Sequence, residues 1–225
     1  MNNGKLYIVA TPIGNLEDIT YRAVRILSEV DYILAEDTRV TGVLLAKYGI
    51  AKPQKRYDAH ASEKTHDMVL EDIAAGKKIA LVSDAGTPCI SDPGVLLVKK
   101  AREAHLPIEA IPGVSAITTA FSIAGIEGNQ FAFRGFVPHK KGRETFFKAI
   151  ADDAEIPHMF YESVHRIEKT LESLAQHLSV DRTVTVAREL TKLHEEVIQG
   201  TPEEVRDHYK NNPSTIRGEF VVIVS

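Results

Sequence analysis

Apolar runs and amphipathic segments alternate along the first half of the chain. Apolar strand-like runs lie at 6–10 and 32–35, a charged start leads into an apolar run at 77–82, and a short strand is predicted at 108–110. Helical spacing of apolar residues covers 19–30, 40–48, 62–75, 93–104 and 114–124. Continuous apolar runs are typical of strands buried on both faces, and their alternation with helices is typical of a parallel sheet. The pattern predicts an α/β domain with a mostly parallel sheet and helices on both of its faces.

The periodicity stops at 125–129, where two glycines and an asparagine indicate a linker. A second series then predicts strands at 130–134, 158–161, 182–187, 195–199 and 219–224, and helices at 142–150, 163–178 and 202–209. The apolar strand at 219–224 should be paired inside a sheet, and Ser163 is the predicted cap of its helix. We therefore predict two α/β domains, residues 1–125 and 126–225, each with a mixed or mostly parallel sheet and flanking helices.

The segment 83–94 makes a polar turn, S-D-A-G-T-P-C-I-S-D-P-G, directly after an apolar strand. Asp92 can cap the helix that follows, and Pro93 suits the first helical position, where its missing N–H costs nothing. Ligands of open α/β sheets lie beyond the carboxyl ends of the strands. The turn therefore predicts a ligand site.

Two more strand-to-helix turns lie at 11–18 and 111–116. Pro12 restricts the backbone of the first turn, and Gly14 lets a ligand approach it closely. Free N–H groups at the start of the helix after the second turn attract polar ligand atoms. The chain contains neither G-x-G-x-x-G nor G-x-x-x-x-G-K-[ST], which argues against a dinucleotide fingerprint and a phosphate loop. A plain tight turn is the alternative for both segments.

Two adjacent carboxylates, Glu36 and Asp37, follow the second strand, with Arg39 close behind. Adjacent strand positions face opposite sides, so the two carboxylates are not expected to share a proton. Pairing with Arg39 and capping of the next helix are the structural alternative to a role in a ligand site. Polar residues also follow strands at 161–166 and 187–192, and two halves with polar strand ends suggest one shared cleft.

Composition narrows the possible partners. The 225 residues carry a formal charge of −4, so nucleic acid would need a local basic patch. The densest candidate is 139–143, H-K-K-G-R, for which a solvated loop is the alternative. The single cysteine, Cys89, excludes an internal disulfide, and His60 and His66 do not form an H-E-x-x-H pair, so no metal is predicted. No run approaches about 18 apolar residues, so we expect no membrane span and a cytoplasmic protein.

Six segments together resemble a known family: T-P-I-G-N-L at 11–16, E-D-T-R at 36–39, the turn at 83–94, Y-E-S-V-H-R at 161–166, A-R-E-L-T at 187–191 and R-G-E at 217–219. They resemble the bacterial 16S ribosomal RNA 2′-O-ribose methyltransferases of the tetrapyrrole methylase superfamily. The match runs in order over nearly the whole chain, and the 83–94 string is highly specific. P-G-V at 112–114 departs from the P-G-P expected in close relatives.

The resemblance implies a class III methyltransferase with two α/β domains, S-adenosylmethionine in the cleft between them, and a homodimer. The implied reaction is methylation of the ribose 2′-hydroxyl of a cytidine in the decoding region of 16S rRNA, with the small ribosomal subunit as partner. The implied cofactor-binding residues are Pro12, Gly14, Asp84, Ala85, Thr87, Ser115, Ala116, Tyr161, Glu162 and Leu190.

Methyl transfer to a hydroxyl needs alignment and an acceptor for the proton. The candidates are Asp37, which corresponds to a second-strand carboxylate of tetrapyrrole relatives, together with Glu36 and Glu189. Phosphate contacts are predicted for basic residues near the expected site: Arg39, Lys140, Lys141, Arg143, Arg166 and Arg188. The alternatives are a methyltransferase of the same fold that acts on a tetrapyrrole carbon or a protein side chain, and a non-catalytic nucleotide- or RNA-binding module.

Overall fold

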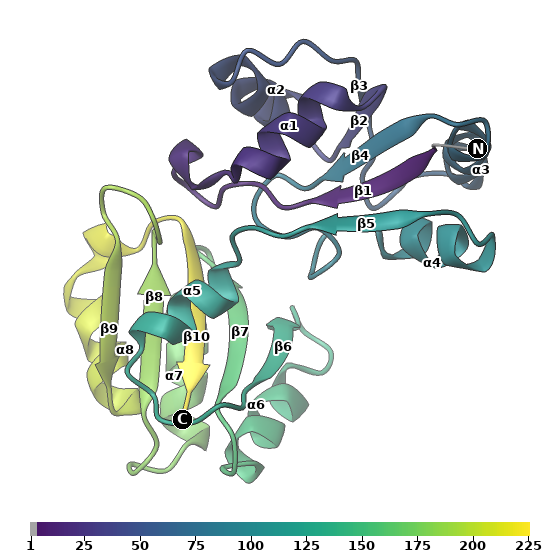
Figure 1. Cartoon of the computed structure of the whole chain (residues 1–225). Coiled ribbons are helices and arrows are strands. Elements are labelled where there is room, and N and C mark those ends of the chain that lie inside the picture. The colour runs from purple at the N-terminus through teal and green to yellow at the C-terminus, as the bar shows by residue number, and fades with distance from the viewer. Residues whose placement is uncertain (1–3) are drawn as a thin grey trace. The chain divides into compact units, whose positions relative to one another are not determined.

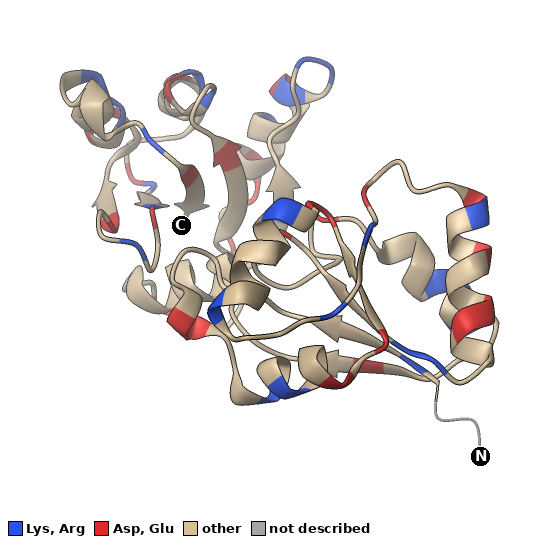
Figure 2. Cartoon of the chain, turned by 90° about the horizontal axis from the view of Figure 1, so that it is seen from above, with Lys and Arg blue, Asp and Glu red and all other residues tan. Residues whose placement is uncertain are grey.

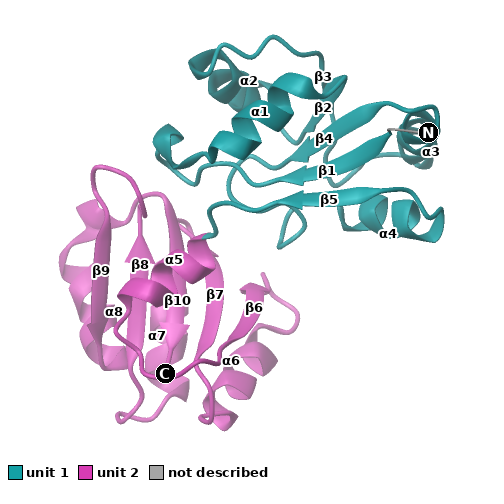
Figure 3. Ribbon diagram, viewed as in Figure 1, with its two compact units in different colours: residues 1–115 teal, residues 116–225 magenta. Residues whose placement is uncertain are grey.

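The structure, a computed structural model, describes residues 4–225, so residues 1–3 of the first predicted domain lie outside it. It contains two compact units, residues 1–115 and 116–225 (Figure 3). The division falls before helix α5 (Ala116–Ile123), whereas the predicted boundary falls after it. Helix α5 follows a strand of the first unit along the chain, but it packs against strand β10 (Glu219–Val224) of the second.

The first unit is built on a five-stranded parallel sheet with the strand order β3-β2-β4-β1-β5. Its strands are β1 (Lys5–Val9), β2 (Tyr32–Ala35), β3 (Gln54–Arg56), β4 (Lys78–Val82) and β5 (Ile108–Ile111). The parallel sheet confirms the prediction from the apolar runs. Strand β3 was not predicted, because its sequence Q-K-R contains no apolar residue.

Helices cover both faces of this sheet (Figure 1). Helices α1 (Tyr21–Glu29) and α2 (Thr38–Lys47) share a core with one face, which includes Leu27, Ile33 and Val9. Helices α3 (Glu63–Ala74) and α4 (Val95–Glu103) share a core with the other face, which includes Leu81 and Leu97. A short 3₁₀ turn, η1 (Leu16–Asp18), precedes α1.

Helices α3 and α4 begin differently from one another: a side chain caps α3, whereas a glycine precedes α4. Ser62 caps α3 as predicted, since its hydroxyl accepts a hydrogen bond from the Thr65 backbone N–H. The prediction that Asp92 caps α4 was wrong, because the turn continues to Gly94 and the helix begins at Val95. Gly94 has φ +126°, and a Cβ there would lie 2.5 Å from a Leu81 methyl carbon, so the turn needs a glycine at this point.

The second unit has a mixed five-stranded sheet with the order β6-β7-β10-β8-β9. Its remaining strands are β6 (Ala132–Phe136), β7 (His158–Ser163), β8 (Val184–Arg188) and β9 (Glu196–Gly200). Strand β6 pairs β7 in parallel, whereas the other three pairings are antiparallel. Strand β10 lies between β7 and β8, which confirms that the terminal apolar strand is paired inside a sheet.

Helices α6 (Arg143–Asp152), α7 (Ile167–His177) and α8 (Pro202–Asn211) pack on one face of the second sheet, and α5 lies on the other (Figure 1). A 3₁₀ turn, η2 (Pro213–Thr215), follows α8. The prediction that Ser163 caps α7 was wrong: Ser163 ends β7, and the N-cap position is occupied by Arg166. Within residues 4–225, no helix combines the length and the apolar character that crossing a membrane requires.

Candidate functional site

The carboxyl ends of β1 and β4 form the topological switch point of the first unit. These strands are neighbours in the sheet, but the chain leaves β1 toward helix α1 on one face and leaves β4 toward helix α4 on the other. The two connections diverge at the carboxyl edge of the sheet, which is where ligands bind in open α/β folds. The turns at 11–18 and 83–94 both start at this edge.

Hydrogen bonds tie the turns at this edge together. Thr11 and Gly86 exchange backbone hydrogen bonds of 2.9 and 3.0 Å, and the buried Thr11 hydroxyl donates to the Ser83 carbonyl at 3.1 Å. The Thr87 hydroxyl donates to the Val114 carbonyl at 3.1 Å, which links the turn to the segment after β5. The backbone around the candidate site is therefore fixed by the fold.

The predicted cofactor residues of the first unit occupy these turns in different environments. Pro12 is buried, Thr87 is half-buried, and Gly14 and Ala85 are exposed. Ser115 and Ala116 are half-buried, and they follow one another where the first unit ends and α5 begins.

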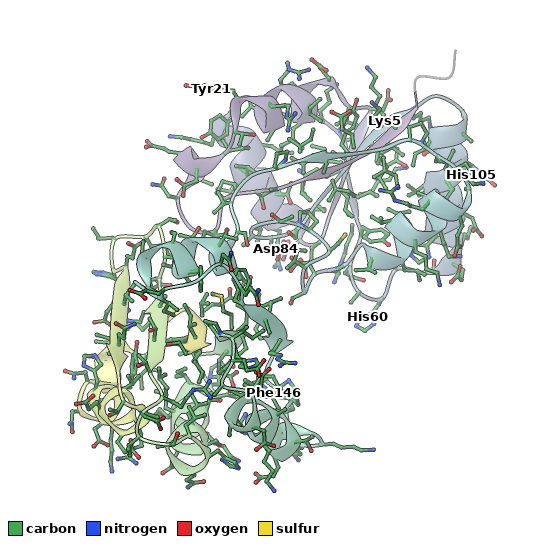
Figure 4. All side chains as sticks on the ribbon, turned by 60° about the horizontal axis from the view of Figure 1, so that its bottom comes forward. Lys5, Tyr21, His60, Asp84, His105 and Phe146 are labelled. Atoms are coloured by element: carbon green, nitrogen blue, oxygen red, sulfur yellow. The ribbon has the colours of Figure 1, made fainter. Side chains whose placement is uncertain are left out.

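Three carboxylates come together at the ends of β2 and β4. The Asp37 backbone N–H donates to Asp84 Oδ1 at 3.0 Å, and the Asp84 backbone N–H donates to Glu36 Oε2 at 3.5 Å. Asp84 is exposed at this edge of the sheet (Figure 4). The sequence could not show this contact, because 47 positions separate Asp37 from Asp84.

The two carboxylates after β2 have opposite electrostatic environments. The Arg39 guanidinium, 2.5 Å from Asp37 Oδ2, holds the pKa of Asp37 far below its ordinary value. Burial raises the pKa of Glu36, and the charges of Asp84, Asp58 and Asp37 add to this, although the hydrogen bond from the Asp84 backbone lowers it in part. Asp37 also caps α2 by accepting a hydrogen bond from the Arg39 backbone N–H at 2.8 Å. The structural alternative of ion pairing and capping is thus confirmed for Asp37.

This edge fits a ligand that is cationic and rich in hydroxyl or amino donors. Ionised carboxylates accept hydrogen bonds and attract positive charge. Asp84 is the exposed member of the trio and has Glu36 and Asp37 as neighbours, so a cation placed beside it would meet net negative charge. A phosphate group would be repelled at the same place.

In the second unit, Glu162 is a buried carboxylate, unlike the exposed Asp84 of the first unit. Its side chain is fully buried, and Oε1 accepts from Arg166 at 2.7 Å and from the Ser163 backbone N–H at 2.8 Å. Oε2 accepts from the Thr170 hydroxyl at 2.6 Å and lies 3.7 Å from Arg143 Nη1. Both oxygens are therefore engaged by protein groups.

The segment after β8 turns sharply. Glu189 and Thr191 have φ values of +49° and +67°, a region that is strained for residues with side chains. Leu190, between them, is buried, and the Glu189 carboxylate accepts from Lys192 Nζ at 2.7 Å. A Cβ at neighbouring Gly218 would meet the Glu189 carboxylate, so the Glu189 side chain would have to shift. Strained turns cluster at ligand sites, which supports keeping Leu190 as a candidate.

The six basic residues predicted to contact RNA divide into an exposed and an enclosed group. Lys140 and Lys141 are exposed, and so is Arg39, whose guanidinium pairs with Asp37. The enclosed arginines each pair with a glutamate: Arg143 and Arg166 with Glu162, and Arg188 with Glu196 at 2.6 Å. Lys and Arg are interspersed with Asp and Glu along both units (Figure 2).

The two histidines weighed as a metal pair have different roles. His60 projects from its loop (Figure 4), whereas His66 is buried and its Nε2 lies 3.0 Å from the Tyr57 hydroxyl. Among residues 4–225, no three His, Cys, Asp or Glu side chains come together as a metal site. Cys89 is half-buried, and burial raises the pKa of its thiol to about 11, which favours a packing role over nucleophilic chemistry.

Thr11 is the residue of this site that sequence reasoning missed. It lies within the resembling segment 11–16 but was assigned no role, although it joins the turns after β1 and β4. A hydroxyl directly after an apolar strand is a signal that could have identified it, because a buried hydroxyl must find a partner.

Residues 5–206 match the family described as tetrapyrrole (corrin/porphyrin) methylases. The chain belongs to this family. The match covers most of both units and confirms the resemblance inferred from the strand-end motifs.

The names of two relatives are more specific than the family description. The chain is 46% identical over 223 residues to a Haemophilus influenzae protein named ribosomal RNA small subunit methyltransferase I, covering 98% of this chain and 78% of that one. It is 44% identical over 222 residues to a Thermotoga maritima protein of the same name, covering 99% of this chain and 98% of that one.

Solved structures of low sequence identity share the fold. A cobalt precorrin-4 methyltransferase of cobalamin biosynthesis superposes with a TM-score of 0.73 at 20% identity, covering 98% of this chain and 94% of that one. A uroporphyrin-III C-methyltransferase from Thermus thermophilus, complexed with S-adenosylhomocysteine, gives 0.66 at 19% identity, covering 99% of this chain and 97% of that one. The two-unit α/β fold predicted from the resemblance is thus confirmed.

Proposed function

We propose that the chain is an S-adenosylmethionine-dependent methyltransferase that modifies the ribose 2′-hydroxyl of a cytidine in the decoding region of 16S rRNA. The observation that carries the proposal is the identity of 44–46%, over 98–99% of this chain, to proteins named ribosomal RNA small subunit methyltransferase I. The small ribosomal subunit is its partner, and the cytoplasm, where such subunits are found, is its compartment.

The acidic edge of the first unit fits the proposed cofactor, which carries a sulfonium, an ammonium group and a ribose diol. We assign Asp84 to accept hydrogen bonds from the donor groups of this cofactor, and the backbone at Gly14, Ala85 and Thr87 to further contacts with it. From the second unit, Tyr161 and Leu190 remain the proposed contacts. Glu162 supports that unit from within, because both of its oxygens are engaged by its own neighbours.

S-adenosylmethionine supplies the methyl group when it is bound, and the protein must take up the proton of the attacking hydroxyl. Glu36 suits this task best of the three candidates, since its raised pKa makes it the stronger proton acceptor. Arg39 holds the pKa of Asp37 low, and Lys192 engages Glu189. Glu36→Gln should lower kcat by a larger factor than it weakens cofactor binding, to which Glu36 contributes only as a neighbour of Asp84. The wild-type rate should fall at acid pH around a pKa above the ordinary 4.5 of a glutamate.

The decisive experiment incubates the purified chain and tritiated cofactor with small ribosomal subunits lacking the modification, with a porphyrinogen as the competing substrate. We expect label in 16S rRNA at one ribose, located by primer extension at low nucleotide concentration. Label in the porphyrinogen alone would support the tetrapyrrole alternative. Cofactor binding without transfer to either would support a non-catalytic module. The implied homodimer is a prediction that sedimentation equilibrium tests.

A further inference from the structure

The edge strand β6 carries an irregularity that changes the direction of one aromatic side chain. Phe133 pairs with Met159 of β7 and Phe136 pairs with Tyr161, so three steps along β6 match two along β7. Gly135, inside this β-bulge, has φ +69°. Residues three apart on a regular strand face opposite sides, but one extra residue returns Phe136 to the side of Phe133.

The result is a row of three aromatic rings on one side of the sheet edge. Tyr161 lies between the others, with ring centroids 5.1 Å from Phe133 and 5.2 Å from Phe136. This side is opposite to α6 and α7, whose core contains Phe160, the neighbour of Tyr161 on β7. Phe136 ends the row and is 45% exposed, which is unusual for a phenylalanine held against another ring.

Positive charge follows Phe136 directly along the chain. Residues 128–143 contain no Asp or Glu, although the protein as a whole has more acidic than basic residues. Lys140 and Lys141 are exposed, and neither forms an ion pair with another residue of the described part of the chain. An exposed ring followed four and five positions later by two exposed lysines supplies what single-stranded nucleic acid needs, with stacking for the bases and charge for the phosphates.

The loop that carries these lysines is fixed at both ends by Glu162. Arg166, which pairs with Glu162, donates to the Val137 carbonyl at 2.8 Å before the loop. Arg143, after the loop, reaches the same carboxylate at 3.7 Å and donates to the Thr170 hydroxyl at 2.8 Å. A fixed loop loses little conformational freedom when a ligand binds, which favours affinity.

We propose that Phe136 stacks on a nucleobase of the RNA substrate while Lys140 and Lys141 hold the adjoining phosphates. This inference rests on the proposed function and adds to it a substrate-contacting residue. Recognition by stacking needs an unpaired base, because rRNA segments are read by proteins mainly where their bases are unstacked and accessible.

Steady-state kinetics on small ribosomal subunits tests the stacking directly. Phe136→Ala should raise KM for the subunit about 5- to 150-fold, the range that base–aromatic stacking provides, and leave the calorimetric Kd for the cofactor unchanged. Phe136→Tyr should restore most of the loss, since it keeps the ring. The matched control is Tyr21→Ala, which removes an aromatic side chain 98% exposed on α1. Far-UV circular dichroism checks that all variants are folded.

A spectroscopic measurement gives an independent readout. The chain contains no tryptophan, so Phe136→Trp creates a single reporter at the proposed stacking position. Its fluorescence should be quenched on titration with small subunits, whereas Tyr21→Trp should show no such change.

The outcomes separate the inference from the proposed function. If the wild type methylates the subunit but Phe136→Ala has an unchanged KM, or Phe136→Trp is not quenched, the stacking role is overturned. A weaker cofactor Kd in Phe136→Ala would also overturn it, because the ring would then contact the cofactor. If the wild type transfers no methyl group to the subunit, the proposed function itself fails.

Discussion

Replacing Glu162 by glutamine tests whether this buried carboxylate supports the second unit from within. The substitution keeps the size of the side chain but removes the charge that the Arg143 and Arg166 guanidiniums share. It also replaces one acceptor oxygen by an NH₂ group, which would face the Arg166 and Ser163 donors or the Thr170 hydroxyl. At least one buried donor then loses its acceptor.

Breaking a buried ion pair by removing one partner costs about 3–5 kcal/mol. The side chains of Arg143 and Arg166 are 11% and 18% exposed, so water can solvate them in part after the carboxylate is removed. We therefore expect a loss near the lower end, about 3 kcal/mol. With a urea m-value of about 2–3 kcal/mol/M, a loss of about 3 kcal/mol moves the midpoint of unfolding down by about 1–1.5 M.

Urea unfolding followed by far-UV circular dichroism measures this shift, and hydrogen exchange with mass spectrometry assigns it to residues 116–225. Glu155→Gln is the matched control, because it removes an exposed carboxylate from a loop of the same unit and should change stability by less than about 0.5 kcal/mol. At low temperature the folded Glu162→Gln variant should bind the cofactor normally. Unchanged stability together with lost cofactor binding would refute the reasoning and return Glu162 to the cofactor contacts.

Three further predictions concern other parts of the chain. Asp84→Ala should abolish cofactor binding in calorimetry while circular dichroism stays unchanged, and retained affinity would remove Asp84 from the site. Glu144, 2.8 Å from His177, raises the pKa of that histidine above its ordinary 6.5. The ion pair therefore stabilises the fold fully below pH 6.5, and this stabilisation is lost as the pH rises through the raised pKa of His177. His177→Gln should flatten this dependence of the free energy of unfolding on pH, as measured by urea titrations. Gly218→Ala, at φ +75° and pressed on Glu189, should lower the free energy of unfolding by about 1–3 kcal/mol, and Glu189→Ala should recover part of the loss in the double variant.

The sequence was sufficient where hydrophobic pattern alone determines structure. Apolar runs identified β1, β2 and β4, and the short strand β5 was predicted although it contains Glu109. The edge strand β3 was missed because its sequence Q-K-R contains no apolar residue. The start of α4 was misplaced because it depends on the backbone conformation of Gly94, which the spacing of apolar residues does not reveal.

The candidate site was predictable in its location but not in its chemistry. Asp84 and Asp37 both follow strands, and strands β4 and β2 are neighbours, so the topology brings them together. The burial of Glu162 was not predictable, because one of its arginine partners, Arg143, lies 19 positions earlier at the start of α6, whereas the other, Arg166, is the N-cap of α7. Whether a polar residue at the end of a strand faces a ligand or the protein interior depends on the charged side chains that the fold places around it.

The position of β10 in the chain delays completion of the second sheet during synthesis. Residues 219–224 supply the strand between β7 and β8, so the sheet of the second unit is two separate pieces until these residues have been synthesised. The two core clusters of the first unit use no residue after Ile111, and domains generally fold as units from the N-terminus during synthesis, so we expect the first unit to fold first. Until β10 has been made, the edges of β7 and β8 that it will pair have no partner strand, and such unpaired edges are sites of wrong pairing and aggregation.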